Sequence, residues 1–253
     1  MGKETIMMIH GMWGAGRFWN NYVDYFKRKG YECLSPTLPL HDENSNEASL
    51  SSIGTTSLLE YVEFLEKEIR KMDKPPILVG HSMGGLLAQK LGALGLAKKL
   101  VLIAPAPPSG INALKYSVIK SFSNILMTWG FWRKPHRLTF EKSVYSMLHL
   151  MSAEEQKKVY DSFVFESGKA MFEIGYWYVD SKKVAKVNET EITCPVLVVS
   201  GAEDRITPVT VVRKVAKKYN ATYKEFQNHA HWIVSEPDWE DVAGYIFDWL
   251  SLK

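Results

Sequence analysis

The sequence has few cysteines and no long apolar run. Cys33 and Cys194 are the only two cysteines among 253 residues, and neither lies in a CxxC pair or a metal-spaced His/Cys cluster. We expect both to be buried small side chains rather than a disulfide, and we expect no metal and no cofactor. No apolar stretch reaches the roughly 18 residues of a membrane span. An integral membrane segment is therefore not predicted.

An excess of charge of one sign is also lacking. The 31 basic residues are nearly balanced by 28 acidic ones, for a net charge of +3, with no long block of like charge. Nucleic-acid binding is therefore not predicted. Residues 1–5 lead into an apolar strand without the features of a secretory signal. We expect a cytoplasmic chain that acts on a small molecule, and nothing in the sequence indicates an oligomeric state.

What is present is an alternation of short apolar strands with helices. Hydrophobic residues make up 46% of the sequence, and 253 residues suffice for one core with an insertion. The alternation predicts an α/β fold, with a mostly parallel sheet of about six strands and helices on both faces. We expect strands at 6–9, 33–38, 77–79, 100–104, 195–199 and 222–226, and a polar loop at 41–52.

Residues 107–184 interrupt this alternation. The segment has helical patterns at 112–128, 139–150 and 153–165 and no clear strand. The sequence therefore predicts a core domain made of residues 1–106 and 185–253, with a helical insertion between the two parts.

The pentapeptide Gly80-His81-Ser82-Met83-Gly84 lies between an apolar strand and a helix. That context is typical of a nucleophile elbow, in which a serine occupies a strained turn at the top of a sheet. The strain is tolerable only if the residues two before and two after lack side chains, as Gly80 and Gly84 do. Ser82 is therefore the candidate nucleophile, and the alternative is an ordinary glycine-rich turn.

A serine nucleophile needs a neighbouring base and a carboxylate that orients the base. The strand at 195–199 is followed by two acids at the edge where sites on parallel sheets assemble, Glu203 and Asp204. We predict Asp204 as the triad acid, with Glu203 as the alternative. In a purely structural interpretation, Asp204 caps the helix after Pro208.

The histidine is expected after the acid in the chain order of this kind of site. His229 and His231 both follow the last strand, and we predict His231 as the base, with His229 as the alternative. The other histidines are poorer candidates, since His41 lies in a polar loop, His136 and His149 lie in the insertion, and His81 is expected to pack under the elbow.

Attack on an ester carbonyl creates an oxyanion that needs preorganised donors. The backbone amide of Met83, at the start of a helix, is one predicted donor. The amide of Met12, in the loop after the first strand, is the other. Alternatively, His10 and Gly11 merely turn the chain there.

With these motifs assembled, the chain resembles the α/β-hydrolase superfamily, especially bacterial esterases, monoacylglycerol lipases and lysophospholipase-like members. The resemblance rests on residues 10–14, 80–85, 200–204 and 229–232, in family order. It implies that residues 107–184 form a cap over the active site. The chain departs from the family pattern at its first strand, which already leads into the loop at residues 10–14, so we expect the two antiparallel opening strands of the full fold to be absent. Serine at the elbow argues against the dehalogenase and epoxide hydrolase branches, whose nucleophile is aspartate.

The insertion holds 14 of the chain's 31 aromatic residues. As a group these rings are candidates for the wall of an apolar pocket, while most of them individually are expected to pack in the core. The predicted pocket residues are four of these rings, Trp129, Phe131, Trp132 and Trp177, together with Trp13 from the loop after the first strand. The same segment has eleven basic and seven acidic residues, a weak hint toward lipid-like esters or a membrane surface.

The sequence thus predicts a hydrolase of carboxylic esters, short to medium or lipid-like, that acts through an acyl-serine intermediate. One alternative uses the same triad on carbon–carbon bonds, thioesters or amides, or for perhydrolysis, because a fold does not fix a reaction. Another class of function is a ligand receptor with vestigial hydrolysis.

Overall fold

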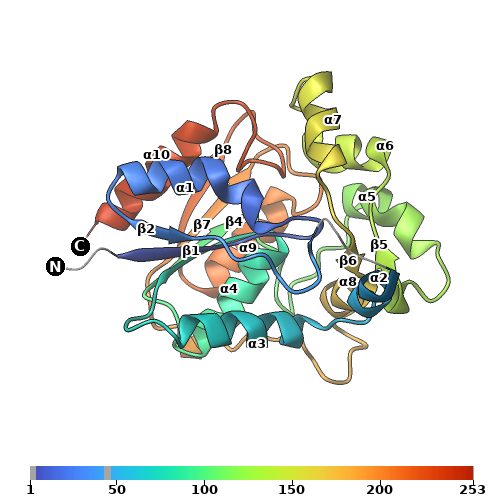
Figure 1. Cartoon of the computed structure of the whole chain (residues 1–253), viewed down its shortest axis with the longest axis horizontal. Coiled ribbons are helices and arrows are strands. Elements are labelled where there is room, and N and C mark those ends of the chain that lie inside the picture. Colours follow the sequence, from blue (N-terminus) through green and yellow to red (C-terminus); the bar gives the residue numbers. More distant parts are fainter. Residues whose placement is uncertain (1–3, 43–46, 253) are drawn as a thin grey trace.

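A computed structural model describes residues 4–42 and 47–252, and its centre is a six-stranded sheet (Figure 1). All neighbouring strands pair in parallel, in the order β2-β1-β3-β4-β7-β8. The strands are β1 (Thr5–Ile9), β2 (Glu32–Leu34), β3 (Ile77–His81), β4 (Lys99–Ile103), β7 (Val196–Gly201) and β8 (Thr222–Phe226). The predicted parallel sheet is confirmed.

Both faces of the sheet are buried, which explains the continuous apolar runs. In β1, Ile6 and Met8 pack into one hydrophobic cluster, whereas Met7 and Ile9 pack into the other. Successive side chains of a strand point to opposite faces, so a strand covered on both sides has no polar face.

Helices cover the two faces. The first face is covered by α1 (Asn20–Arg28) and α10 (Trp239–Ser251), which lie above the sheet in Figure 1. The second face is covered by α3 (Leu58–Ile69), α4 (Met83–Ala93) and α9 (Val209–Lys218). Ser57 and Glu60 form a capping box at the start of α3. A short 3-10 helix, η1 (Gly16–Trp19), precedes α1.

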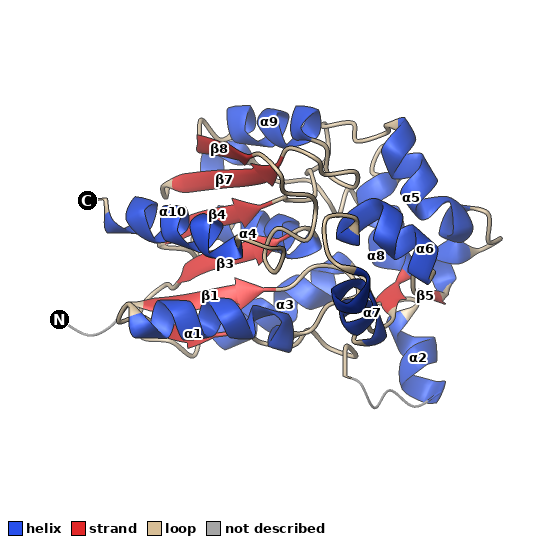
Figure 2. Ribbon diagram, turned by 90° about the horizontal axis from the view of Figure 1, so that it is seen from above, coloured by secondary structure: helices blue, strands red, loops and turns tan. Residues whose placement is uncertain are grey.

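In the segment between β4 and β7, the helices and strands of residues 116–175 lie beyond the carboxyl ends of the sheet strands (Figure 2). Its elements are α5 (Tyr116–Leu126), η2 (Phe131–Arg133), β5 (Pro135–His136), α6 (Phe140–Ser143), η3 (Val144–Leu148), α7 (Ala153–Asp161), β6 (Glu166–Ser167), α8 (Gly168–Gly175) and η4 (Glu189–Glu191). A third hydrophobic cluster joins this segment to the sheet domain and includes Trp13, Phe163 and Trp232. Within the described ranges, no helix has the length and apolarity to cross a membrane.

Three local predictions need correction. The segment between β4 and β7 contains two strands, β5 and β6, which pair antiparallel over two residues each, too short to leave a periodic pattern. The second strand ends at Leu34 because Pro36, within the range expected for it, has no N–H for a ladder bond. Within the expected loop 41–52, the structure has α2 (Glu47–Ile53), while residues 43–46 lie outside the described residues.

A buried polar network also joins the segment between β4 and β7 to the sheet domain. Glu166 of β6 accepts a hydrogen bond from the hydroxyl of Tyr61, at 2.9 Å, and lies 3.0 Å from Nε2 of His41. The carboxylate and the imidazole are both fully buried. Burial lowers the pKa of His41, but the charge of Glu166 and the hydrogen bond to it outweigh this effect and raise the pKa overall. The pair therefore ties β6 to the loop after β2.

Candidate active site

Ser82 occupies a strained turn between β3 and α4. Its backbone has φ 54° and ψ −120°, a conformation that is costly for a residue with a side chain. A Cβ on Gly80 would lie 2.3 Å from the carbonyl oxygen of Gly84, and one on Gly84 would lie 2.2 Å from that of Ile9. The backbone therefore packs too closely for any residue but glycine at both positions.

His231 links Ser82 to Asp204. Its Nε2 lies 2.9 Å from Oγ of Ser82, and its Nδ1 lies 2.8 Å from Oδ2 of Asp204. Asp204 lies in the loop after β7 and His231 in the loop after β8, so both come from the carboxyl edge of the sheet. All three side chains are buried. The structure thus brings together the three residues expected from sequence.

The two alternative residues lie elsewhere. Glu203 is exposed, and Oε2 of its carboxylate lies 3.9 Å from Nε2 of His149. His229 lies 3.2 Å from Glu236 through its Nδ1. No hydrogen bond joins either residue to Ser82.

The surroundings of Asp204 keep its carboxylate ionised. One oxygen accepts hydrogen bonds from the amides of Ile206 and Thr207, both at 2.8 Å, and the other accepts one from the Thr207 hydroxyl at 2.7 Å. Burial raises the pKa of Asp204, but the charge of His231 and the hydrogen bonds from His231 and Thr207 outweigh it and hold the pKa below its ordinary value. The carboxylate is thus available to orient an imidazole.

The hydrogen bond from Thr207 to Asp204 was not predicted from the sequence. Aspartate carboxylates commonly accept hydrogen bonds from the backbone two residues later, as Asp204 does from Ile206. The capping interpretation of Asp204 was close to this, yet α9 has Pro208 as its N-cap residue. Asp204 therefore organises the loop before the helix rather than the helix itself.

Two buried side chains, His81 and Glu236, bind the backbone of residues 230 and 231 and are called the clamp below. Nε2 of His81 donates to the carbonyl of His231 at 2.8 Å, and Oε2 of Glu236 accepts from the amide of Ala230 at 2.8 Å. Burial lowers the pKa of His81 to about 3, which keeps its ring neutral. The sequence predicted packing for His81, and gave no reason to single out Glu236.

The loop after β1 passes directly beside the serine. A Cβ on Gly11 would lie 2.9 Å from Cβ of Ser82. His10 fixes this loop, since its Nδ1 donates to the Gly11 carbonyl at 2.9 Å and its Nε2 accepts from the Leu38 amide at 3.0 Å. His10 therefore does more than turn the chain.

The two residues predicted to donate backbone amides, Met12 and Met83, border the same cavity as Ser82. Met83 is the first residue of α4, where helix geometry leaves N–H groups without intrahelical acceptors.

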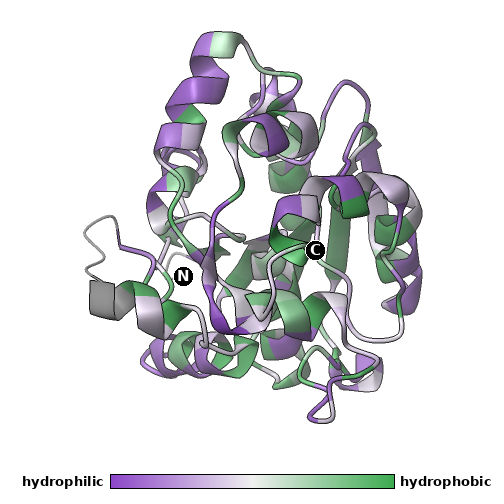
Figure 3. Cartoon of the chain, turned by 90° about the vertical axis from the view of Figure 1, so that its right-hand side faces the viewer, coloured by the Kyte–Doolittle hydropathy of each residue, from purple (hydrophilic) through white to green (hydrophobic). Residues whose placement is uncertain are grey.

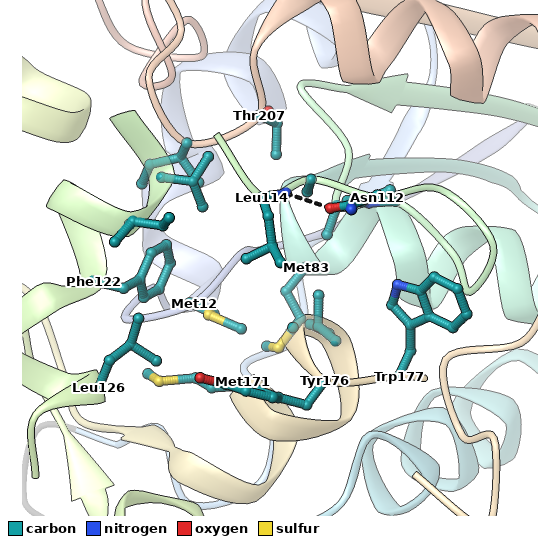
Figure 4. A pocket seen from close by; sticks show the side chains of 18 of the residues that line it. Met12, Met83, Asn112, Leu114, Phe122, Leu126, Met171, Tyr176, Trp177 and Thr207 are labelled. Atoms are coloured by element: carbon teal, nitrogen blue, oxygen red, sulfur yellow. Dashed lines mark hydrogen bonds between the residues drawn. The ribbon is translucent and has the colours of Figure 1, made fainter. Parts of the chain in front are cut away.

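A cavity of ≈ 160 Å³ opens above Ser82, between the sheet edge and helices α5 and α8 (Figure 4). Its wall is made mainly of aliphatic, methionine and aromatic side chains, among them Phe122, Leu126 and Met171. Of the described residues that line it, none carries a charge. The few polar groups include Thr207 and Asn112, whose Oδ1 accepts from the Leu114 amide at 2.7 Å.

Phe131 and Trp177 of the predicted pocket residues line this cavity. The other three do not. Trp13 is buried in the third cluster, with its indole N–H donating to the His136 carbonyl at 3.1 Å. Trp129 is 87% exposed, and Trp132 packs against Phe131 and Phe172 outside the cavity. Composition identified a segment rich in aromatic residues, but whether each ring faces the cavity depends on packing.

In residues 4–42 and 47–252 there is no cluster of three His, Cys, Asp or Glu side chains that could hold a metal ion.

Comparison with known proteins identifies relatives across almost the whole chain. The sequence profile of the alpha/beta hydrolase family matches residues 6–244. Protein ABHD8 of Bos taurus is 26% identical over 221 residues, which cover 84% of this chain and 48% of that protein. The chain thus spans about half the length of these first curated relatives.

Two further similarities extend over most of both chains. A putative esterase/lipase 2 of Mycoplasma pneumoniae is 25% identical over 234 residues, covering 88% of this chain and 78% of that protein. The crystal structure of a monoacylglycerol lipase from Paleococcus ferrophilus superimposes with a TM-score of 0.70 at 21% identity, covering 99% of this chain and 96% of the other. The structural similarity shows a shared fold.

Proposed function

Because the chain belongs to the alpha/beta hydrolase family, we propose that it is a serine hydrolase that cleaves carboxylic esters through an acyl-serine intermediate. The observation that carries this proposal is the buried series of hydrogen bonds from Ser82 through His231 to Asp204, at the base of an apolar cavity. The names of relatives, an esterase/lipase and a monoacylglycerol lipase, support the same class of reaction.

In the first half of the reaction, Oγ of Ser82 attacks the ester carbonyl while Nε2 of His231 takes the hydroxyl proton. The amides of Met12 and Met83 stabilise the oxyanion that forms. Asp204 stabilises the imidazolium. The carbon–oxygen bond to the alcohol then breaks, and His231 returns its proton to the departing alcohol. Ser82 is left as an acyl ester.

In the second half, His231 takes a proton from a water molecule, which attacks the acyl carbonyl. The tetrahedral species collapses, the bond to Oγ of Ser82 breaks, and His231 returns the proton to the serine. The carboxylic acid is released and the free enzyme restored. The cycle consumes one water and needs no redox step.

The cavity indicates the kind of ester. Because no described lining residue is charged, a substrate carboxylate buried there would lack a partner, which is costly. A neutral aliphatic chain instead gains about 0.8 kcal/mol for each buried methylene. Residues 107–184 act as a cap that supplies most of this wall, on a core domain of residues 1–106 and 185–253.

The substrate proposal predicts a chain-length profile. With p-nitrophenyl esters from acetate to dodecanoate, we expect kcat/KM to rise roughly tenfold or more from two to about eight carbons as the chain fills the cavity. An ester of a dicarboxylic acid of equal length is expected to react at least tenfold more slowly, because of its charge. A vinylogous diketone assayed alongside tests the carbon–carbon alternative. Turnover of that compound alone, or turnover below about one per minute with every ester, contradicts ester hydrolysis.

The clamp predicts that His81 positions His231 without touching substrate. In His81→Leu the carbonyl of His231 loses its buried donor, and we expect kcat to fall roughly 10- to 100-fold with KM nearly unchanged. His81→Gln keeps an N–H donor and is expected to recover most of that loss. Stopped-flow or steady-state kinetics at pH 8 checks this, and circular dichroism verifies folding. Equal kcat in Leu and Gln variants that both fold contradicts a positioning role.

A further inference from the structure

Exposed apolar side chains are concentrated in one part of the molecule. In the described chain, nine of the thirteen exposed large apolar side chains lie between residues 114 and 179. Those of Tyr116 and Val179 are 78% and 59% exposed. Single exposed apolar residues are normal on a protein surface, but a concentration of this kind marks an interaction site.

Part of this surface is the mouth of the cavity. Leu114, Ile119 and Tyr178 are exposed, and each also lines the cavity above Ser82. Tyr116 and Val179 are their sequence neighbours and lie outside the lining. We call these five residues the mouth patch. The side chains of Leu114, Ile119 and Tyr178 thus connect solvent to the cavity that Ser82 also lines. The five residues lie in the loop before α5, in the first residues of α5 and in the turn after α8. Figure 3 views the molecule from the side on which these helices lie.

The chain segments that carry the mouth patch are rich in positive charge. The two segments that carry it, residues 112–121 and 176–184, contain four lysines and a single acid, Asp180. The lysines are Lys115, Lys120, Lys182 and Lys183, and all four are exposed. The Asp180 carboxylate accepts hydrogen bonds from the backbone amides of Lys182 and Val184, at 3.0 and 2.7 Å. It is therefore already engaged by the backbone.

Exposed apolar side chains next to exposed lysines favour an anionic lipid surface as the partner. A second copy of the chain would bring like charges together across the interface, which is unfavourable. An anionic lipid surface accommodates both components, because tyrosine and aliphatic side chains enter the headgroup region while lysines contact the anionic headgroups. We propose that the mouth patch docks on anionic lipid surfaces, so that an apolar ester passes from the lipid into the cavity without crossing water. The last step rests on the proposed function, whereas docking itself does not.

The test measures docking separately from catalysis. Ser82→Ala protein is sedimented with vesicles of phosphatidylcholine alone or with 30% phosphatidylglycerol. We expect binding to the anionic vesicles and at least tenfold weaker binding to the neutral ones. Lys115→Gln/Lys182→Gln is expected to lower the partition coefficient roughly 25-fold, since each lysine near an anionic surface contributes a factor of about five. Tyr116→Ser/Val179→Ser is expected to lower it at least tenfold.

A matched control uses exposed leucines of the sheet domain, Leu59 and Leu94, which are 47% and 51% exposed. Leu59→Ser/Leu94→Ser is expected to bind like the parent. Equal loss in the control and the mouth variants overturns the proposal, as does absence of binding to anionic vesicles. Self-association that Tyr116→Ser/Val179→Ser abolishes also overturns it, in favour of a second copy. Docking by the Ser82→Ala protein, together with absence of esterase activity in the unaltered protein, would instead contradict the proposed function and leave the docking inference supported.

Discussion

Replacing Ser82 with alanine is expected to lower kcat/KM toward p-nitrophenyl octanoate by at least about 10⁴-fold, and by up to about 10⁶-fold. The reason is that, among the residues the structure describes, Ser82 supplies the only oxygen at hydrogen-bond distance from Nε2 of His231. Any rate that remains comes from binding and from the oxyanion donors, which act on attack by water. The measurement is an initial rate in a continuous assay at 405 nm.

The fold should tolerate this change, because alanine keeps the Cβ that already fits beside Gly11 and loses a single oxygen atom. We expect the thermal unfolding midpoint to stay within about 4 °C of the parent. Ser51→Ala, at an exposed position of α2, is the matched control and should retain full activity. Undiminished hydrolysis by a folded Ser82→Ala protein would exclude the acyl-serine mechanism.

Asp204→Asn is expected to lower kcat by roughly 10⁴-fold. The amide can turn its NH₂ group toward Nδ1 of His231, and the imidazole then carries its proton on Nε2. In that tautomer the imidazole cannot take a proton from Ser82. The remaining oxygen of the asparagine can still accept from the amides of Ile206 and Thr207, so the loop should keep its shape.

Glu203→Gln is the matched control, since it makes the same chemical change one residue earlier on an exposed side chain. We expect less than a threefold change in kcat. A larger loss in Glu203→Gln than in Asp204→Asn would mean that the loop after β7 adopts another register during catalysis, with Glu203 as the orienting acid.

The parallel sheet could be predicted because its strands are buried on both faces. Ile6 to Ile9 and Leu100 to Ile103 form apolar runs, and burial of both strand faces requires such runs. The elbow could be predicted because only glycine satisfies the contacts at residues 80 and 84. Burial of both strand faces and close backbone packing each act on residues that are consecutive or closely spaced in the sequence, so each leaves a pattern that can be recognised there.

The parts that escaped prediction depend on contacts distant in sequence. The antiparallel pair β5 and β6 joins His136 to Glu166 and Pro135 to Ser167, residues 30 and 32 positions apart, through two short strands. Glu236 contacts the His231 segment through a backbone amide, an interaction that leaves no trace in residue type. Phe131 and Trp177 line the cavity whereas Trp13 and Trp132 do not, and this difference depends on how each ring packs. Localisation in the cytoplasm stays a prediction.

The chemical role of Ser82 has a direct measurement. A fluorophosphonate reacts with an activated serine by forming an oxygen–phosphorus bond and releasing fluoride, which leaves a stable adduct. Peptide mass spectrometry after labelling should place one phosphonate on Ser82, and His231→Ala should reduce the labelling rate by at least about 10³-fold. Continued ester turnover by fully treated protein, with Ser82 unmodified, would contradict the proposed mechanism.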